Sequence, residues 1–160
     1  MNNNKTHNLA QGAVIAALYT VLTLVSSTLG LASGVVQIRL SEAMTIMPIF
    51  TPAAVPGLCV GCFISNVITG CAPMDVIGGT MATLVGALLT SRLANHKVLA
   101  SLPPIIANTI MIPLVLAYVY DFEGSLLYFT ITVFVGEVIA AGVLGQVLRR
   151  LLEPYAEQLR

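Results

Sequence analysis

Apolar residues fill long stretches of this chain, and polar residues interrupt them at only a few points. The first stretch, residues 8–29, is long enough as an α-helix to cross about 30 Å of hydrocarbon at 1.5 Å per residue. Three later stretches are equally plain and predict helices at 75–91, 98–119 and 125–148. The connections between these three, 92–97 and 120–124, are too short to hold a domain.

The apolar stretch 43–70 is harder to interpret because prolines occur at positions 48, 52 and 56. A single α-helix over that stretch would be about 42 Å long, and each proline would remove one of its hydrogen bonds. A break near residues 51–52 is more economical and predicts helices at 36–50 and 53–69. The expected fold is therefore a single domain, residues 1–160, forming an all-α integral membrane bundle of six transmembrane helices. The alternative fuses the two helices and leaves five spans.

Lysine and arginine indicate how the spans are oriented, because cytoplasmic loops carry an excess of both. With six spans and cytoplasmic termini, one basic residue, Arg39, lies outside and the others face inward: Lys5, Arg92, Lys97, Arg149, Arg150 and Arg160. Five spans with an external N-terminus make Lys5 the single exception, so charge alone does not choose. The loop with Asp121 and Glu123 is external in both arrangements. The N-terminal stretch also resembles a signal peptide, although its apolar run exceeds the usual core of about 7–15 residues.

The composition agrees with a membrane protein. Of the 160 residues, 57% are hydrophobic and only 9% are charged, against about 25% charged in soluble domains. So few charges cannot cover a soluble globule, which excludes a soluble enzyme. The formal net charge of zero excludes nucleic-acid binding driven by phosphate attraction. The chain contains no phosphate-binding loop of the Gly-x-x-x-x-Gly-Lys type, so ATP-driven transport would need another subunit.

Ionisable and amide side chains at membrane depth are costly and therefore informative. Glu137 lies about 18 Å from the outer end of the sixth predicted helix at 1.5 Å per residue. Asn108 lies at nearly the same depth on the antiparallel fifth helix, so the two side chains can face one cavity. The alternative for both residues is packing, with a protonated Glu137 and an amide that bridges neighbouring helices.

Further polar residues gather near the outer mouth, and together they outline a funnel with Asn108 and Glu137 as its floor. Arg39 and Glu42 are one turn apart on the second helix, Asn66 is near the end of the third, and Asp75 opens the fourth. Each also has a plainer interpretation. Arg39 and Glu42 can be a local ion pair, and Asp75 can simply begin a helix, where a carboxylate suits the helix dipole.

Small residues and cysteines also occur at spacings that can indicate helix contacts or a metal site. Ala13 and Ala17 form an Ala-x-x-x-Ala pair on the first helix, which allows another helix to approach closely. Packing within the bundle and docking of a partner explain that pair equally well. Cys59 and Cys62 have the spacing of a metal or redox pair, but no further ligands are near them in the sequence, so core packing is favoured. No cofactor or metal site is predicted.

Three segments together closely resemble the QueT family: IRLSEAMTIMP at 38–48, TPAAVPG at 51–57 and DVIGGTMATL at 75–84. QueT proteins are substrate-specificity (S) components of bacterial energy-coupling factor (ECF) transporters for queuosine precursors. The resemblance implies a six-helix S component in the bacterial cell membrane. Such a subunit captures its nutrient outside and topples in the bilayer on a shared transmembrane scaffold subunit driven by two ATPase subunits. It also implies that Ala13 and Ala17 are the docking motif.

The ligand that the resemblance implies is a 7-deazaguanine. Its ring presents an N–H and an amine side by side, which one carboxylate can accept together, and a carbonyl that needs a donor. Either Glu137 or Glu42 can supply the carboxylate, and Asn108, Asn66 or Arg39 the donor. Our hypothesis is that Glu137 reads the ring edge and that the outer carboxylates meet a cationic aminomethyl group where the ligand has one. Tyr128 can stack on the ring or anchor its helix at the membrane interface.

Two other classes of protein compete with this interpretation. An integral membrane enzyme would need a nucleophile, base or metal in mutual reach, and no histidine occurs in the predicted spans. A purely structural or assembly protein would not need an acid at the position of Glu137.

Overall fold

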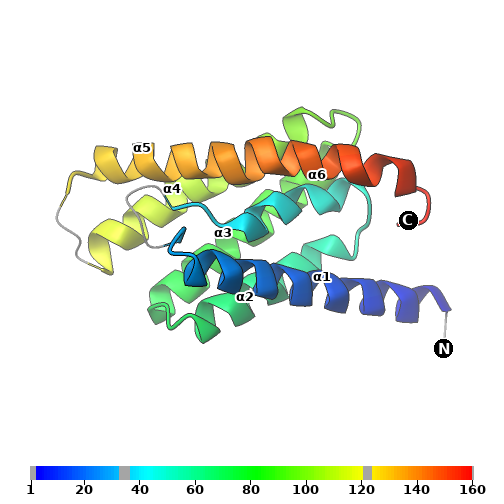
Figure 1. The fold of residues 1–160 in the computed structure, drawn as a ribbon, viewed down its shortest axis with the longest axis horizontal. Helices are drawn as coiled ribbons and strands as arrows, with labels where there is room; N and C mark the ends of the chain where they lie inside the picture. Colours follow the sequence, from blue (N-terminus) through cyan, green and yellow to red (C-terminus); the bar gives the residue numbers. More distant parts are fainter. Residues whose placement is uncertain (1–2, 33–36, 121–123, 160) are drawn as a thin grey trace.

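Every element that the structure describes is helical. The computed structural model describes residues 3–32, 37–120 and 124–159, and no strand occurs within them. Figure 1 shows the helices as a bundle, in the order α1 (Asn3–Thr28), η1 (Leu40–Ile49), α2 (Ala54–Ile68), α3 (Pro73–Arg92), η2 (Leu99–Ser101), α4 (Leu102–Tyr118), α5 (Leu126–Glu137), η3 (Val138–Leu144), α6 (Gly145–Leu152) and η4 (Glu153–Tyr155). The expected all-α architecture is confirmed. The predictions for Asp121, Glu123 and Arg160, and the start of a helix at residue 36, lie outside the described residues.

Among the described residues, four helical segments are long and apolar enough to cross a membrane: Lys5–Thr28, Pro73–Arg92, Leu99–Tyr118 and Leu126–Tyr155. α2 is also apolar but has only 15 residues. The last segment joins α5, η3, α6 and η4 into one continuous rod, so the helix predicted at 125–148 continues to Tyr155. A rod of that length is roughly 45 Å long, and its final turns extend beyond about 30 Å of hydrocarbon.

η1 differs most from the helix predicted for it. It is a 3-10 helix of ten residues, and all of its residues from Ser41 to Ile49 are buried except Ala43. Pro48 has no N–H to donate, and the Thr45 hydroxyl donates to the Glu42 carbonyl at 2.6 Å, so the α-helical bonding pattern is interrupted here. α1, α3, η3 and α6 all pack against η1. It is therefore an inner element of the bundle.

The predicted break between the second and third helices is present. η1 ends at Ile49 and α2 begins at Ala54. Between them the Thr51 hydroxyl accepts from the Ala53 N–H at 3.3 Å and donates to Gln11 Oε1 at 2.8 Å, which fixes the turn against α1. The bundle therefore has separate second and third segments, as expected for six helical segments rather than five.

α1 is packed closely into the bundle along α2. A Cβ added at Gly57 would lie 2.7 Å from the Gly12 carbonyl oxygen, and one added at Gly61 would lie 2.8 Å from the Tyr19 Cβ. Only glycine permits helix backbones to approach this closely. Ile15 and Tyr19, on the same face of α1, are buried in the largest apolar cluster. The first predicted helix is thus an integral part of the core.

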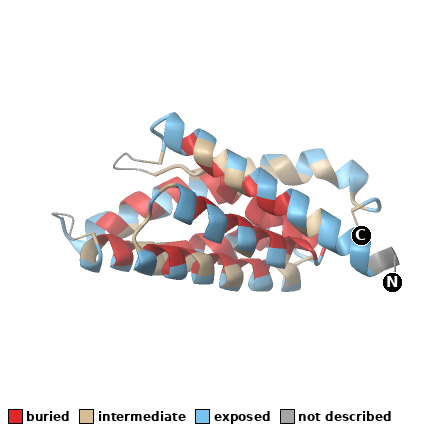
Figure 2. Ribbon diagram, turned by 90° about the horizontal axis from the view of Figure 1, so that it is seen from below, coloured by how far each residue is buried: buried red, intermediate tan, exposed pale blue. Residues whose placement is uncertain are grey.

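Burial follows the pattern of a bundle whose outer faces are apolar. Figure 2 shows the buried residues gathered between the helices and the exposed residues on their outer sides. Many of those exposed side chains are large and apolar, among them Leu18, Phe63, Ile110 and Phe134. An apolar exterior of this extent is expected for helices in contact with lipid.

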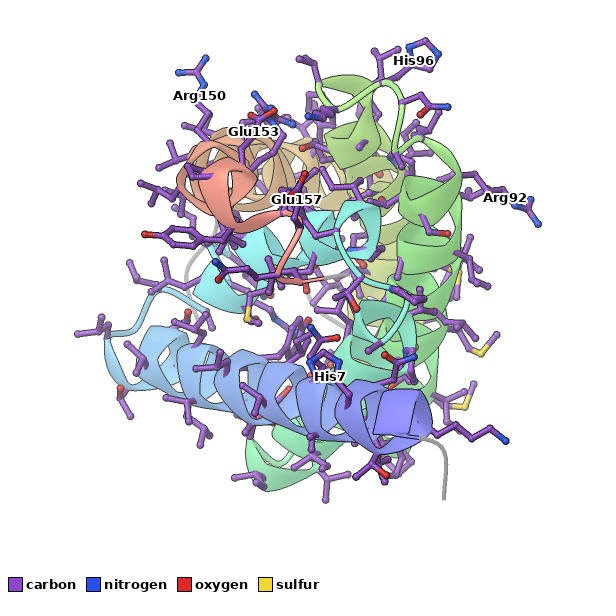
Figure 3. All side chains as sticks on the ribbon, turned by 90° about the vertical axis from the view of Figure 1, so that its right-hand side faces the viewer. His7, Arg92, His96, Arg150, Glu153 and Glu157 are labelled. Atoms are coloured by element: carbon purple, nitrogen blue, oxygen red, sulfur yellow. The ribbon has the colours of Figure 1, made fainter. Side chains whose placement is uncertain are left out.

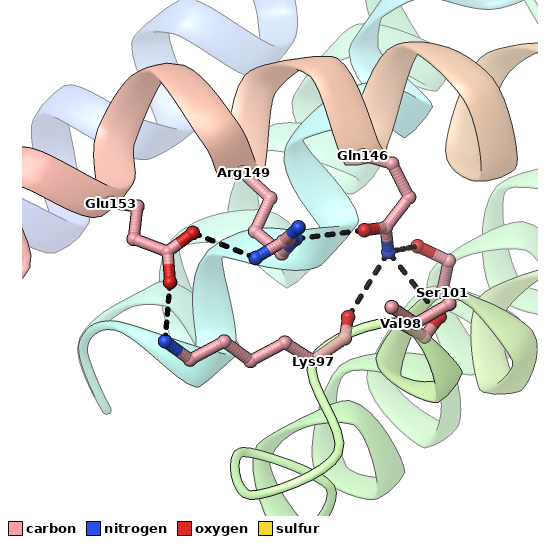
Figure 4. Close-up of polar contacts among 6 residues, drawn as sticks. All are labelled: Lys97, Val98, Ser101, Gln146, Arg149 and Glu153. Carbon is pink, nitrogen blue, oxygen red and sulfur yellow. Dashed lines mark hydrogen bonds and ion pairs between the residues drawn. The ribbon is translucent and has the colours of Figure 1, made fainter.

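Both described chain ends lie at the same end of the bundle (Figure 1). Figure 3 looks onto that end and shows His7, Arg92, His96 and Arg150 there. The connection between α3 and α4 is fastened to α6 at this end (Figure 4). Gln146 Nε2 donates to the Lys97 carbonyl at 3.1 Å and to Ser101 Oγ at 2.7 Å, while Lys97 Nζ lies 2.6 Å and Arg149 Nη1 2.8 Å from the Glu153 carboxylate.

Candidate functional site

A small polar cavity lies inside the bundle, between η1 and the helices α2 to α5. Its volume is about 20 Å³, which is room for a single water. It is lined by Gln37, Arg39, Glu42, Cys62, Gly79, Thr83, Asn108, Ile112, Val133 and Glu137. Four of the six residues predicted from sequence to hold a ligand therefore line one cavity: Arg39, Glu42, Asn108 and Glu137.

Asn108 joins two carboxylates in this cavity. Its Nδ2 donates to Glu137 Oε1 at 3.0 Å and lies 3.4 Å from Glu42 Oε2. All three side chains are buried, with exposed fractions of 3% for Glu42, 5% for Asn108 and 9% for Glu137. Asn108 and Glu137 meet as their depths along α4 and α5 predicted. Glu42 was placed at the rim of the funnel, but η1 carries it inward to join them.

Glu137 retains unused hydrogen-bonding capacity. Its Oε2 is buried and accepts no hydrogen bond from the described residues. A buried carboxylate oxygen without a donor is rare in proteins and points to a role beyond packing. The π-helical segment η3 starts directly after Glu137, and such segments occur often at functional sites.

The residue before Glu137 is a glycine for a steric reason. A Cβ at Gly136 would lie 2.1 Å from the Gln37 carbonyl oxygen and 3.1 Å from its carbonyl carbon. The backbone that leads into η1 therefore lies directly against α5. This contact brings Arg39 and Glu42 to the same cavity as Glu137.

Arg39, in the wall of the cavity, pairs with Asn66. Arg39 Nη1 donates to Asn66 Oδ1 at 3.2 Å, and Asn66 Nδ2 lies 3.6 Å from Cys62 Sγ. Both ion pairs among the described residues involve Glu153 at the far end of the molecule, so the expected alternative of a local Arg39–Glu42 ion pair is not formed. Arg39 instead shares the cavity with Glu42 and is held by an amide.

Asp75 lies beside the cavity rather than in its wall. It accepts a hydrogen bond from the Tyr120 hydroxyl at 2.9 Å, and that hydroxyl accepts from the Ala72 N–H at 3.0 Å. Burial raises the pKa of Tyr120 to about 12, so the hydroxyl keeps its proton and can donate. Asp75 is also in the first turn of α3, where a carboxylate suits the helix dipole. Its helix-start interpretation thus agrees with its position.

Tyr19 was not identified from the sequence. Its hydroxyl donates to Glu42 Oε1, and its side chain is only 1% exposed. The signal available was a tyrosine in the middle of an apolar helix, where the phenol oxygen needs a buried partner. Its partner could not be identified because the rotation of α1 against η1 is a tertiary property. Gln37 and Thr83 also line the cavity and had no distinguishing pattern.

The remaining predicted residues lie outside the cavity. Ala13 and Ala17 are on the exposed side of α1, where another helix can reach them. Tyr128 is 46% exposed and meets Phe129 edge-on with ring centroids 5.8 Å apart, so its position suits an interfacial anchor better than a stacking partner. Cys62 belongs to the apolar core and also lines the cavity. Among the described residues, no three of the types His, Cys, Asp and Glu are grouped to hold a metal ion.

The sequence of this chain matches a family model and a known protein. A family model described as "QueT transporter" matches residues 9–154. A protein of Lactococcus lactis subsp. cremoris (strain MG1363), named "Queuosine precursor transporter QueT", is 33% identical over 96 residues. That alignment covers 58% of this chain and 56% of the relative, so it spans little more than half of either protein. No solved structure matches.

Proposed function

Because this chain belongs to the QueT transporter family, we propose that it is the substrate-specificity subunit of an ECF importer and binds a queuosine precursor in its polar cavity. The observation that carries the proposal is the buried group of Glu42, Asn108 and Glu137. Two carboxylates and an amide inside an apolar bundle are expensive to keep unless a polar ligand uses them.

The chemistry of the cavity suits a 7-deazaguanine. Glu137 can accept the adjacent ring N–H and amine, since its Oε2 has no donor among the described residues. Arg39 or Asn108 donates to the ring carbonyl, with Asn66 orienting the guanidinium at 3.2 Å. Glu42 and the neighbouring Asp75 favour a cationic substituent on the ligand. Glu42 therefore takes part in ligand binding inside the cavity rather than at its rim, because its carboxylate lines the same cavity as Glu137.

Binding requires the cavity to enlarge. A fused bicyclic ring is several times larger than the single water for which the cavity has room. Gln37 lines the cavity and its backbone lies against Gly136 of α5, so this segment and α5 separate when the ligand enters. Closing again over the ring removes water and strengthens each hydrogen bond to it.

Energy for transport comes from other subunits in this proposal. The chain has no phosphate-binding loop, so two ATPase subunits act through a shared transmembrane scaffold subunit. Ala13 and Ala17, exposed on α1, form the surface that docks on that scaffold, because small side chains let helices approach closely in lipid. The subunit then topples to release its ligand into the cytoplasm.

Orientation in the bacterial cell membrane follows from the basic residues. Arg92 and Arg150 lie at the end that carries both chain termini (Figure 3), and Lys97 and Arg149 are in the network beside them (Figure 4). Arg39 is at the other side, next to Asn66 near the end of α2. The positive end faces the cytoplasm, so the termini are cytoplasmic and the polar cavity is nearer the outside.

The test is ligand binding to purified protein in detergent. We expect Glu137→Gln to weaken binding of 7-cyano-7-deazaguanine, 7-aminomethyl-7-deazaguanine and queuine by about tenfold to a hundredfold, because a charge-assisted acceptor contributes about 1.5–3 kcal/mol. The matched control is Glu157→Gln, which makes the same change at an exposed glutamate outside the ion pairs of Glu153. Equal affinity of Glu137→Gln and the parent protein refutes the role of Glu137. Absence of binding by the parent protein refutes the function.

A further inference from the structure

η1 is attached to α1 by a row of polar contacts. Three hydrogen bonds join consecutive turns of α1 to the start of η1: Tyr19 Oη to Glu42 Oε1, Thr23 Oγ1 to Ser41 Oγ at 2.8 Å, and Leu40 N to Ser26 Oγ at 2.8 Å. All of the side chains in this row are buried. The first turn of η1, which carries the acid of the cavity, is therefore held in place by α1.

Of these three contacts, the one from Tyr19 reaches the cavity. Glu42 accepts from Tyr19 through Oε1 and from Asn108 through Oε2, so both oxygens are held from opposite sides. The phenol ring packs with Ile15 and Leu58 in the apolar core and cannot turn away without opening that core. Tyr19 itself is absent from the cavity wall.

We propose that Tyr19 is a positioning residue for ligand binding: it orients the Glu42 carboxylate from behind and makes the affinity of the cavity depend on the position of α1. The inference rests on the proposed function, since it concerns the same cavity. It extends that function to a residue that contacts no ligand. It also gives α1 two roles, because one side carries Tyr19, which contacts Glu42, while Ala13 and Ala17 are exposed on the other side.

The structure supplies a second way to disturb Tyr19, through the backbone. Gly61 of α2 lies against α1 so closely that an added Cβ would be 2.8 Å from the Tyr19 Cβ and 2.9 Å from the Ala16 carbonyl oxygen. Gly61→Ala therefore pushes α1 away from α2 at the level of Tyr19 and changes no polar group. Gly78→Ala is its control, because the nearest atom to an added Cβ there is Val115 Cγ2 at 3.4 Å, an ordinary contact.

The first experiment compares ligand affinity and thermal unfolding for Tyr19→Phe, with Tyr155→Phe as an exposed control. We expect Tyr19→Phe to weaken deazaguanine binding about tenfold, the size of one hydrogen bond to a charged group. We expect its effect to shrink to less than about twofold in a Glu42→Gln background, because the hydroxyl acts through that carboxylate. The ligand-induced change in the near-ultraviolet tyrosine spectrum should also be lost in Tyr19→Phe.

The results separate positioning from packing. A tyrosine that only packs would lower the melting temperature and leave ligand affinity unchanged, or would weaken binding equally in the Glu42→Gln background; either outcome overturns the proposal. Should Tyr19→Phe not fold, Gly61→Ala decides: weaker binding than in Gly78→Ala supports the proposal, and equal binding overturns it. Failure of the parent protein to bind any deazaguanine refutes the proposed function instead, so the two failures are distinguishable.

Discussion

Asn108 supplies the hydrogen-bond donors between two buried acids. Carboxylates can only accept when ionised, so two of them side by side repel each other unless a donor or a proton lies between them. The Asn108 amide fills that role, with its nitrogen 3.0 Å from Glu137 and 3.4 Å from Glu42. An amide in this position holds the acids at a fixed separation and keeps them available to a ligand.

We expect Asn108→Leu to lower the free energy of unfolding by about 1–3 kcal/mol, the cost of leaving buried acceptors without their donor. Ligand affinity should fall as well, because the two carboxylates lose their common donor. Thermal unfolding in detergent and ligand titration measure the two effects. Asn95→Leu is the control, since Asn95 is exposed. Equal stability of the two variants would contradict the structural role of Asn108.

The sequence predicted part of the buried group of Glu42, Asn108 and Glu137, because the depth of a residue in a regular helix follows from its position in the sequence. Asn108 and Glu137 lie on antiparallel helices with a known rise per residue, so their meeting followed from arithmetic. The position of Glu42 did not follow, because that arithmetic assumed a transmembrane α-helix at 36–50 with Glu42 near its outer end, whereas η1 is a buried 3-10 helix. Tyr19 was missed for a different reason: nothing in a single helix tells which neighbour its buried face contacts.

At the scale of elements, the cavity depends on how closely η1 lies against the α5–η3–α6 rod. η1 is held from one side by α1 and meets the rod on the other at Gly145, while the backbone that leads into η1, at Gln37, meets the rod at Gly136. The rod changes from α- to π-helical winding at Val138, one residue after Glu137. A π segment adds a residue within a turn, and side chains beyond it face a different direction from those before it. Glu137 is the last residue before that change.

Gly136→Ala tests the contact between α5 and the backbone that leads into η1. The added Cβ would lie 2.1 Å from the Gln37 carbonyl oxygen, so the segment before Arg39 must move away. We expect a loss of about 1–3 kcal/mol in stability, as for other overpacked positions, and weaker ligand binding. Gly142→Ala is the control, because the nearest atom to a Cβ added there is Ile105 Cδ1 at 3.5 Å. That variant should keep the stability and the ligand affinity of the parent protein. Equal stability and equal ligand affinity of the two variants would show that the close approach of the Gln37 backbone to α5 is unimportant.

The helix boundaries illustrate which features of the fold a sequence reveals. The four long apolar stretches and the break after η1 were predicted because length, hydropathy and proline act locally. The extension of the rod to Tyr155 was not predicted, because the segment after Leu148 is polar enough to look like a flank. Its end is instead held by contacts from far along the chain, with Lys97 and Arg149 both meeting Glu153.

At the scale of the whole molecule, most of the described basic residues lie at one end of the bundle. The basic residues of α3, α6 and the connection after α3 lie with both chain termini, whereas Arg39 is held beside Asn66 near the opposite end of α2. The common position of the two described chain ends favours six crossings over five, a choice that charge counting left open. His7 lies at the same end as His96 and Arg150 (Figure 3), as an even number of crossings requires.

Labelling with a membrane-impermeant thiol reagent tests this orientation. In a background without the three native cysteines, we expect Ser125→Cys to react in intact cells, whereas His7→Cys and His96→Cys react only after permeabilisation. All three positions are exposed, so differences in reactivity report on the side of the membrane. His7 is the discriminating position, because five spans would place it outside while leaving His96 inside. Reaction of His7→Cys in intact cells, with His96→Cys protected, would therefore contradict the six-segment topology and the cytoplasmic N-terminus proposed from the positive end.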